Sequence, residues 1–161
     1  PFFLSGKPSV GIGKGHEIIV LRKYFPFWVV LAGPVGTPQS NKTAHVYKSL
    51  KLGLTEGPRP ITITLAAIET KSIKSLSGSL FNRLENVVLD WAPLARPFKE
   101  FMLSQGALGA LVSGAGPTVF GIVQDKKQGL RLEKKIRDRF GAAVWVKVVK
   151  TLSRTPGPRR I

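Results

Sequence analysis

The segment that most constrains the fold of this chain lies at residues 106–123 and has the sequence GALGALVSGAGPTVFGIV. Two apolar runs, at 107–112 and 118–123, flank a turn that is rich in glycine. Apolar runs of this length that are bounded by glycine and proline are typical of buried strands. We therefore predict a strand, a turn and a second strand that together form a hairpin.

The turn of this hairpin contains Gly114 and Gly116. Glycine lets backbone amides come close to an anion because it has no Cβ to block the approach. A tight turn that only lets two elements pack against each other would contain the same residues. The turn by itself therefore leaves two interpretations open, an anion-binding turn and a packing turn.

The segments before the hairpin alternate between strand patterns and helix patterns. Residues 17–21 and 27–32 are apolar runs, which predict two strands on either side of a turn, each buried on at least one face. Residues 33–41 and 53–60 are rich in glycine and proline and predict loops. Further along, we expect a helix at 43–50 and a weakly helical stretch at 61–80. A third helix should present Leu84, Val87 and Val88 on one face. A fourth should present Phe98, Phe101 and Met102 and end near Gly106.

After the hairpin, Asp125 is placed to cap a helix whose apolar residues recur every four positions until Gly141 ends it. Alternating valines from Val144 to Val148 predict a last strand. Strands that form hairpins, interleaved with helices, predict an α+β fold. We expect a two-layer sandwich, with helices on one face of a mostly antiparallel sheet.

Composition excludes several classes of site. The chain has 161 residues, 43% of them hydrophobic, which is enough for one domain with a real core. It has no cysteine, which excludes disulfides, thiolate metal sites and cysteine nucleophiles. Its two histidines and nine carboxylates show no metal-ligand spacing, so we expect no dedicated transition-metal site. No apolar run is long enough for a membrane span, and the first residues do not resemble a targeting signal.

The net charge of +16 favours anionic partners such as nucleotides, nucleic acid or acidic surfaces. A charged surface that only keeps the protein in solution has the same composition. The charge therefore indicates one possible function, that of a basic nucleic-acid-binding domain or a non-catalytic interaction domain. The lysines and arginines are spread over every segment, whereas nucleic-acid binding needs a continuous basic face, and this makes nucleic acid the weaker interpretation.

The glycine hairpin resembles the third motif of the GHMP kinase superfamily, which comprises small-molecule kinases. Four further segments are similar, in order, to motifs of one branch of it, the diphosphocytidyl-methylerythritol kinases. They are PFFL at 1–4, GKGHE at 13–17, KTAHVY at 42–47 and NRLE at 82–85. The resemblance extends from residue 1 to about residue 150.

The resemblance implies transfer of the γ-phosphate of ATP, with Mg²⁺, to a hydroxyl of diphosphocytidyl-methylerythritol in non-mevalonate isoprenoid synthesis. It also implies a ferredoxin-like C-terminal domain at 36–150, preceded at 1–35 by remnant strands of the N-terminal kinase domain and followed at 151–161 by a basic tail. It implies a cytoplasmic protein or, alternatively, a plastid protein. The family's catalytic aspartate would lie upstream of Pro1, together with a lysine and a glycine-rich ATP loop. We therefore expect no catalytic residue on this chain, and no phosphorylation by the chain without the N-terminal half.

The resemblance also implies six ligand-facing residues. Tyr47 matches the aromatic residue that stacks on the cytosine ring, and Thr43 matches a polar residue that hydrogen-bonds the ligand. The loop of the third motif, which braces the site near the substrate and the phosphates, corresponds to Ser113, Gly114, Ala115 and Gly116. A core role for Tyr47 and plain N-capping by Thr43 remain the alternatives.

Two of the matching positions depart from the family pattern. Ala115 and Lys42 each stand where the family has serine. The first change removes a hydroxyl from the loop, and the second adds a positive charge at the start of the helix. A further possible function is that the chain belongs to a homologue of the family that has lost catalysis and serves in structure or regulation.

Overall fold

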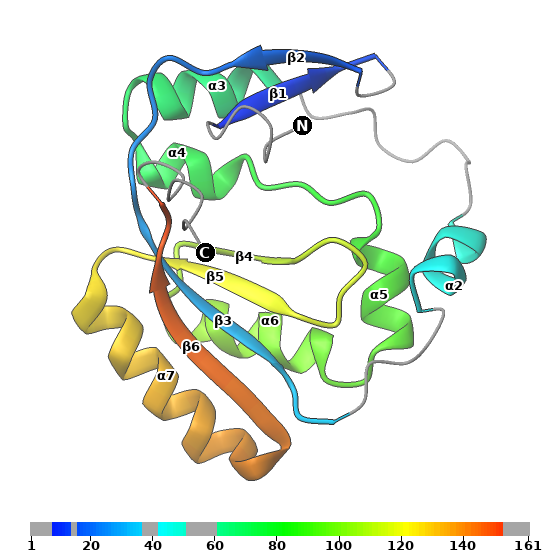
Figure 1. Ribbon diagram of the computed structural model, residues 1–161. Helices are drawn as coiled ribbons and strands as arrows, with labels where there is room; N and C mark the ends of the chain where they lie inside the picture. The colour runs from blue at the N-terminus through cyan, green and yellow to red at the C-terminus, as the bar shows by residue number, and fades with distance from the viewer. Residues whose placement is uncertain (1–7, 14–15, 37–41, 51–60, 153–161) are drawn as a thin grey trace, which may run out of the picture.

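The architecture is organised around a four-stranded antiparallel sheet (Figure 1). The computed structural model describes residues 8–13, 16–36, 42–50 and 61–152. The strands follow one another in space in the order β4-β5-β3-β6. Their bounds are Trp28–Pro34 for β3, Gly109–Val112 for β4, Val119–Val123 for β5 and Val144–Lys150 for β6.

The predicted hairpin is confirmed. Strands β4 and β5 pair antiparallel, with Val112 opposite Val119, and the glycine turn connects them. The Ser113 amide donates to the Thr118 carbonyl over 2.8 Å and closes the ladder beside the turn. Among the described residues β4 pairs only with β5, so it forms one edge of the sheet in this part of the chain.

Two helices, α6 (Ala95–Ser104) and α7 (Lys126–Phe140), cover one face of the sheet (Figure 1). The Asp125 side chain accepts a hydrogen bond from the Gln128 amide and caps α7, as predicted. Gly141 ends the helix with a φ of 58° and opens the short 3₁₀ turn η1 (Gly141–Ala143). The Phe140 and Phe98 rings pack edge to face at a centroid distance of 4.9 Å and thereby join α7 to α6. The two-layer α+β prediction is confirmed.

The predicted helical stretch at 61–80 is divided into two helices, α3 (Ile61–Glu69) and α4 (Ile73–Gly78). Lys71 takes a positive φ of 54°, which ends the first helix, and the Ser72 side chain caps the second. Helix α4 approaches the other face of the sheet at Gly109, where a Cβ would lie 2.7 Å from the Ser77 carbonyl oxygen. Two further helices of the described residues, α2 (Lys42–Ser49) and α5 (Glu85–Trp91), pack against each other.

The prediction for residues 17–21 is wrong in one respect. Strand β2 (Glu17–Val20) exposes every side chain, with Ile19 54% exposed. It pairs with β1 (Ser9–Ile12) in a separate two-stranded sheet and does not pair with β3. An apolar run predicts burial only if another layer covers it, and the described residues place none over β2. The expected domain boundary after residue 35 is a separate question. It groups β3 with the upstream strands, and β3 is hydrogen-bonded between β5 and β6.

Several predicted segments lie outside the described residues: the strand at 1–4, the loop at 53–60 and the tail at 153–161. Among the described residues, no helix combines the length and the apolar character needed to cross a membrane.

The packing between α6 and α7 predicts how the core responds to truncation. Phe98 is fully buried, so Phe98→Ala should lower the free energy of unfolding by about 3–5 kcal/mol. Leu103→Ala on the same helix is the matched control, because Leu103 is exposed, and it should cost less than about 0.5 kcal/mol. Urea unfolding of both variants measures the difference, and equal losses would contradict the assignment of α6 to the core.

Candidate functional site

The glycine turn between β4 and β5 is the first component of the site. The Gly116 amide donates to the Ser113 carbonyl over 2.9 Å. Gly114 and Gly116 have φ values of 56° and 65°, a left-handed conformation that favours glycine. Ser113 and Gly114 are exposed, while Ala115 is half-buried and packs against the hydrophobic core. The tip of the turn therefore faces outward from a fixed base.

The two glycines serve different physical purposes. A Cβ on Gly116 would collide with the Val88 side chain of α5 and come within 3.3 Å of Val112, so this glycine permits close packing. A Cβ on Gly114 would meet no atom within 4 Å. Gly114 is thus required by its backbone conformation and leaves the peptide groups around it accessible. The packing interpretation therefore holds for Gly116, whereas no packing contact requires Gly114, and anion binding at that position stays a prediction.

The turn also offers hydrogen-bond donors. Within the described part of the chain, the N–H groups of Gly114 and Ala115 have no hydrogen-bond partner. Consecutive backbone N–H groups in a turn of this kind form a concavity that attracts anions. The arrangement is suited to binding oxygen atoms that carry negative charge, such as those of a phosphate.

The segment that precedes α5 holds the turn in place. The Asn82 side-chain amide donates to the Val112 carbonyl over 2.9 Å and to the Gly114 carbonyl over 2.8 Å. Its oxygen accepts from the Leu84 amide over 3.0 Å, which forms an Asx turn leading into α5. The Glu85 carboxylate accepts from the Val112 amide over 3.0 Å. Sequence comparison singled out this NRLE segment but assigned no role to it, because contacts across about thirty residues of chain are not visible in a linear sequence.

Helix α2 carries the other predicted residues. Tyr47 is 60% exposed and Val46 fully buried, so Val46 and not Tyr47 supplies the core contact of this helix. This excludes the core role for Tyr47. Thr43 is exposed and is the second residue of α2, a position inside the first turn and not the N-cap.

Helix α5 brings α2 and the glycine turn to the same side of the molecule (Figure 1). The His45 ring of α2 lies 6.0 Å from the Trp91 ring of α5, centroid to centroid. The Gly116 backbone packs on Val88, one helical turn earlier on α5. The six predicted residues thus come from two elements that share one support.

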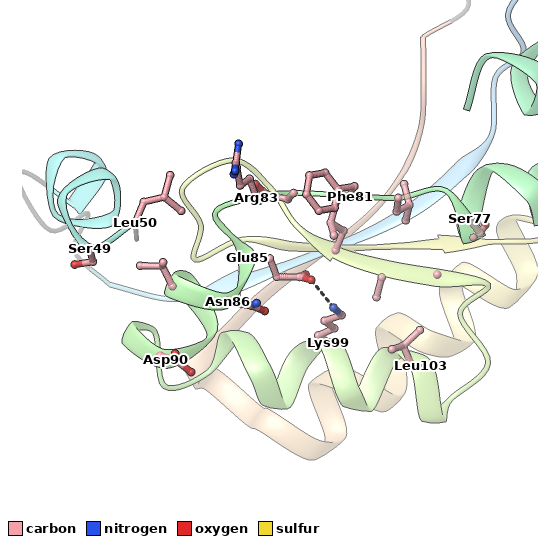
Figure 2. Close-up of a pocket in the computed structure, with 17 residues that line it drawn as sticks. Ser49, Leu50, Ser77, Phe81, Arg83, Glu85, Asn86, Asp90, Lys99 and Leu103 are labelled. Carbon is pink, nitrogen blue, oxygen red and sulfur yellow. Dashed lines mark hydrogen bonds and ion pairs between the residues drawn. The ribbon is translucent and has the colours of Figure 1, made fainter. Parts of the chain in front are cut away.

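A pocket of about 910 Å³ opens beside this support (Figure 2). It is lined by the end of α2, the end of α4, the NRLE segment, α5, α6 and the edge strand β4. In its wall, the Glu85 carboxylate pairs with the Lys99 ammonium group over 2.6 Å. None of the six predicted residues lines this pocket, whereas Asn82, which holds the turn, and the Glu85–Lys99 pair do.

The described residues contain no group of three or more histidine, aspartate and glutamate side chains that could hold a metal ion. We therefore identify no metal centre in this part of the chain.

Comparison with known proteins gives a consistent family. Residues 64–142 match the family described as GHMP kinases C terminal. The chain is 36% identical over 137 residues to the 4-diphosphocytidyl-2-C-methyl-D-erythritol kinase of Brevibacillus brevis, a match that covers 85% of this chain and 46% of that protein. It is 37% identical over 153 residues to the kinase of the same name from Symbiobacterium thermophilum, covering 94% of this chain and 52% of that protein. The chain spans about half the length of the curated relatives it matches.

Solved structures share the fold. The homoserine kinase of Cytophaga hutchinsonii superposes with a TM-score of 0.74 at 15% identity and covers 96% of this chain and 50% of that chain. A 4-(cytidine 5'-diphospho)-2C-methyl-D-erythritol kinase superposes with a TM-score of 0.69 at 22% identity and covers 92% of this chain and 52% of that chain. The predicted GHMP kinase C-terminal fold is confirmed, and the nucleic-acid-binding alternative is not favoured.

The different roles of the two glycines can be measured. Gly114→Ala should cost only the strain of a left-handed alanine, about 1–2 kcal/mol. Gly116→Ala should cost more, because overpacking against Val88 adds about 1–3 kcal/mol. Denaturant unfolding compares the two variants, and a double-mutant cycle with Val88→Ala isolates the contact. The same cost of Gly116→Ala in both backgrounds would contradict the close approach.

Proposed function

We propose that this chain, a member of the GHMP kinases by its C-terminal domain, is the C-terminal part of an ATP-dependent kinase of non-mevalonate isoprenoid synthesis. The enzyme would transfer the γ-phosphate of ATP to the 2-hydroxyl of diphosphocytidyl-methylerythritol. The observation that carries the proposal is the match along 85% or more of the chain to kinases named for this substrate. The exposed and braced glycine turn supports it from the structure.

In the proposed reaction the turn binds phosphate oxygens. Phosphoryl transfer depends on aligning the attacking hydroxyl with the phosphorus atom and on stabilising charge on the transferred group. The Gly114 and Ala115 N–H groups are fixed donors for that charge, and the exposed Ser113 lies beside them. The base that accepts the hydroxyl proton, the assisting lysine and the main ATP loop would come from the upstream half.

The family also implies Mg²⁺ as the partner of ATP, which would neutralise phosphate charge when bound. The described residues offer no cluster of carboxylates for this ion. We assign no Mg²⁺ ligand to them, and no step of the proposed mechanism on this chain passes through the metal.

Recognition of the cytidylyl group is assigned to α2. Thr43 and Tyr47 are four residues apart, so they project from the same face of the helix, and both are exposed. The Tyr47 ring would stack on the cytosine while Thr43 hydrogen-bonds the ligand. Val46, on the buried side, holds the helix against the core.

The rest of the enzyme would cover the apolar strands that this chain exposes. We assign β1 and β2, with their exposed isoleucines, to the N-terminal kinase domain, and we place the start of the C-terminal domain before β3. Partners of the complete enzyme would be ATP and the cytidylyl substrate. We propose a cytoplasmic location, which the bacterial origin of the two kinases compared above supports, with a plastid location as the alternative.

The test of this function is a substrate panel. The full-length gene product, supplied with ATP, should phosphorylate diphosphocytidyl-methylerythritol and leave homoserine and mevalonate unchanged. The last two are the substrates suggested by the names of fold neighbours that are only 14–15% identical. Mass spectrometry of the products decides between them, and phosphorylation of homoserine or mevalonate in place of the cytidylyl compound would overturn the proposal.

Tyr47 gives a sharper test of the site. In the full-length enzyme, Tyr47→Ala should raise KM for the cytidylyl substrate about 5- to 150-fold, which corresponds to the loss of about 1–3 kcal/mol of base stacking, with little change in KM for ATP. Tyr47→Phe should be nearly silent, because stacking uses the ring.

Val46→Ala is the matched control for Tyr47. It should lower the melting temperature without a selective effect on the cytidylyl KM, because Val46 is buried. An unchanged cytidylyl KM in Tyr47→Ala would remove this residue from the site.

A further inference from the structure

The edge strand β4 ends at Val112, and side chains form hydrogen bonds with both the N–H and the C=O group of this residue. In an antiparallel ladder, alternate residues direct their N–H and C=O groups toward the partner strand and away from it. Ser113 bonds across to Thr118, so Val112 directs its groups away from β5. The Val112 amide donates to Glu85, and its carbonyl accepts from Asn82.

A second bond from Asn82 reaches into the turn itself. Its side-chain amide donates to the Gly114 carbonyl over 2.8 Å. The Gly114 carbonyl and the Ala115 N–H belong to one peptide group, which is planar and, in its trans form, directs these two groups in opposite directions. Fixing the carbonyl therefore fixes the direction of the Ala115 N–H, one of the two donors without a partner in the described chain. A donor at the carbonyl also polarises the N–H of the same peptide group.

From these contacts we infer that Asn82 and Glu85 are positioning residues that orient the Ala115 N–H toward a phosphate oxygen. Asn82 sets the direction of the peptide group, and Glu85 fixes the end of the strand from which the turn projects. The catalytic consequence rests on the proposed kinase function, whereas the orientation of the peptide group does not.

Lys99 completes this support from α6. Its ammonium group lies 2.6 Å from the second oxygen of Glu85, and the two side chains are only 24% and 14% exposed (Figure 2). Charge-assisted bonds of this kind are shorter and stronger than neutral ones. The exposed pair between Arg96 and Asp90, also close to α5, has side chains 50% and 76% exposed and fixes no backbone group in the described chain. That pair serves as the matched control.

The decisive variant is Asn82→Asp. It keeps the oxygen that accepts from Leu84 and leads into α5, but it replaces the NH₂ group that donates to the two carbonyls. In the 161-residue chain, ¹⁵N NMR should show the Ala115 amide resonance shifted and its hydrogen exchange changed, while resonances of α7 stay in place. Asp90→Asn should leave the Ala115 amide unchanged. An unmoved Ala115 resonance in Asn82→Asp would overturn the inference.

The effect on catalysis is measured with the full-length gene product. Asn82→Asp should lower kcat about tenfold to a hundredfold, because small misplacements of a positioning group have effects of this size, while KM for the cytidylyl substrate stays within about twofold. Asn82→Ser is a second variant for the same measurement. Its hydroxyl can still accept from the Leu84 amide, and it adds no charge to the site. Should neither variant alter kcat, the positioning role is refuted.

Glu85 provides a graded series. Glu85→Gln keeps an oxygen for the Val112 amide and should retain more activity than Glu85→Ala, which loses that acceptor. Equal activity of the two variants would contradict the role assigned to Glu85. If the wild-type enzyme phosphorylates none of the panel substrates, the proposed function fails, and the NMR experiment still decides the orientation of the Ala115 peptide group.

Discussion

Close packing of the Gly116 backbone on the Val88 side chain sets the distance between α5 and the β4–β5 hairpin. There is no room for a Cβ at this contact, so the turn lies directly against the helix. Asn82 and Glu85, at the start of the same helix, then come within hydrogen-bond distance of Val112 and Gly114. The other end of α5 supports α2 through the ring of Trp91. Each residue assigned to the ligand is therefore placed by a chain of contacts that passes through α5.

This construction separates binding groups from supporting groups. The tip of the turn and the face of α2 that carries Tyr47 are exposed, while Val46, Val88 and the pair of Glu85 with Lys99 are wholly or largely buried. Backbone donors that are held in this way need little reorganisation when charge develops near them. Strand β2 and the end of β1 at Ile12 lie at the opposite limit, with apolar side chains that are exposed in the described chain. Both features fit a domain that meets a second domain across the site.

The parts of the fold that depend on local sequence could be predicted. The hairpin follows from two apolar runs around a glycine turn, and α7 follows from Asp125, Gly141 and the apolar period between them. The fold family followed from the order of short motifs. In each case the signal lies within a few residues of the structure it specifies.

The rest depends on tertiary contacts. Strand β2 has the apolar composition of a buried strand, but exposure depends on which layer lies above it. The break at Lys71 was missed because a single residue with positive φ leaves little trace in periodicity. The roles of Asn82 and Glu85 arise from pairing with a turn about thirty residues away, and the exposure of Tyr47 from the choice of Val46 as the core contact. The motifs located the candidate site, whereas its supporting contacts required the structure.

The central proposal is that this chain contributes the recognition of phosphate and of the cytosine ring to a kinase site, and that the group which accepts the hydroxyl proton belongs to the other half of the enzyme. The most direct test measures formation of phosphorylated diphosphocytidyl-methylerythritol from ATP by two proteins. One is the 161-residue chain alone, and the other is the same chain joined to the N-terminal half of the Brevibacillus brevis kinase. The account predicts product from the joined protein and none from the chain alone. Product from the chain alone, or none from a folded joined protein, would contradict it.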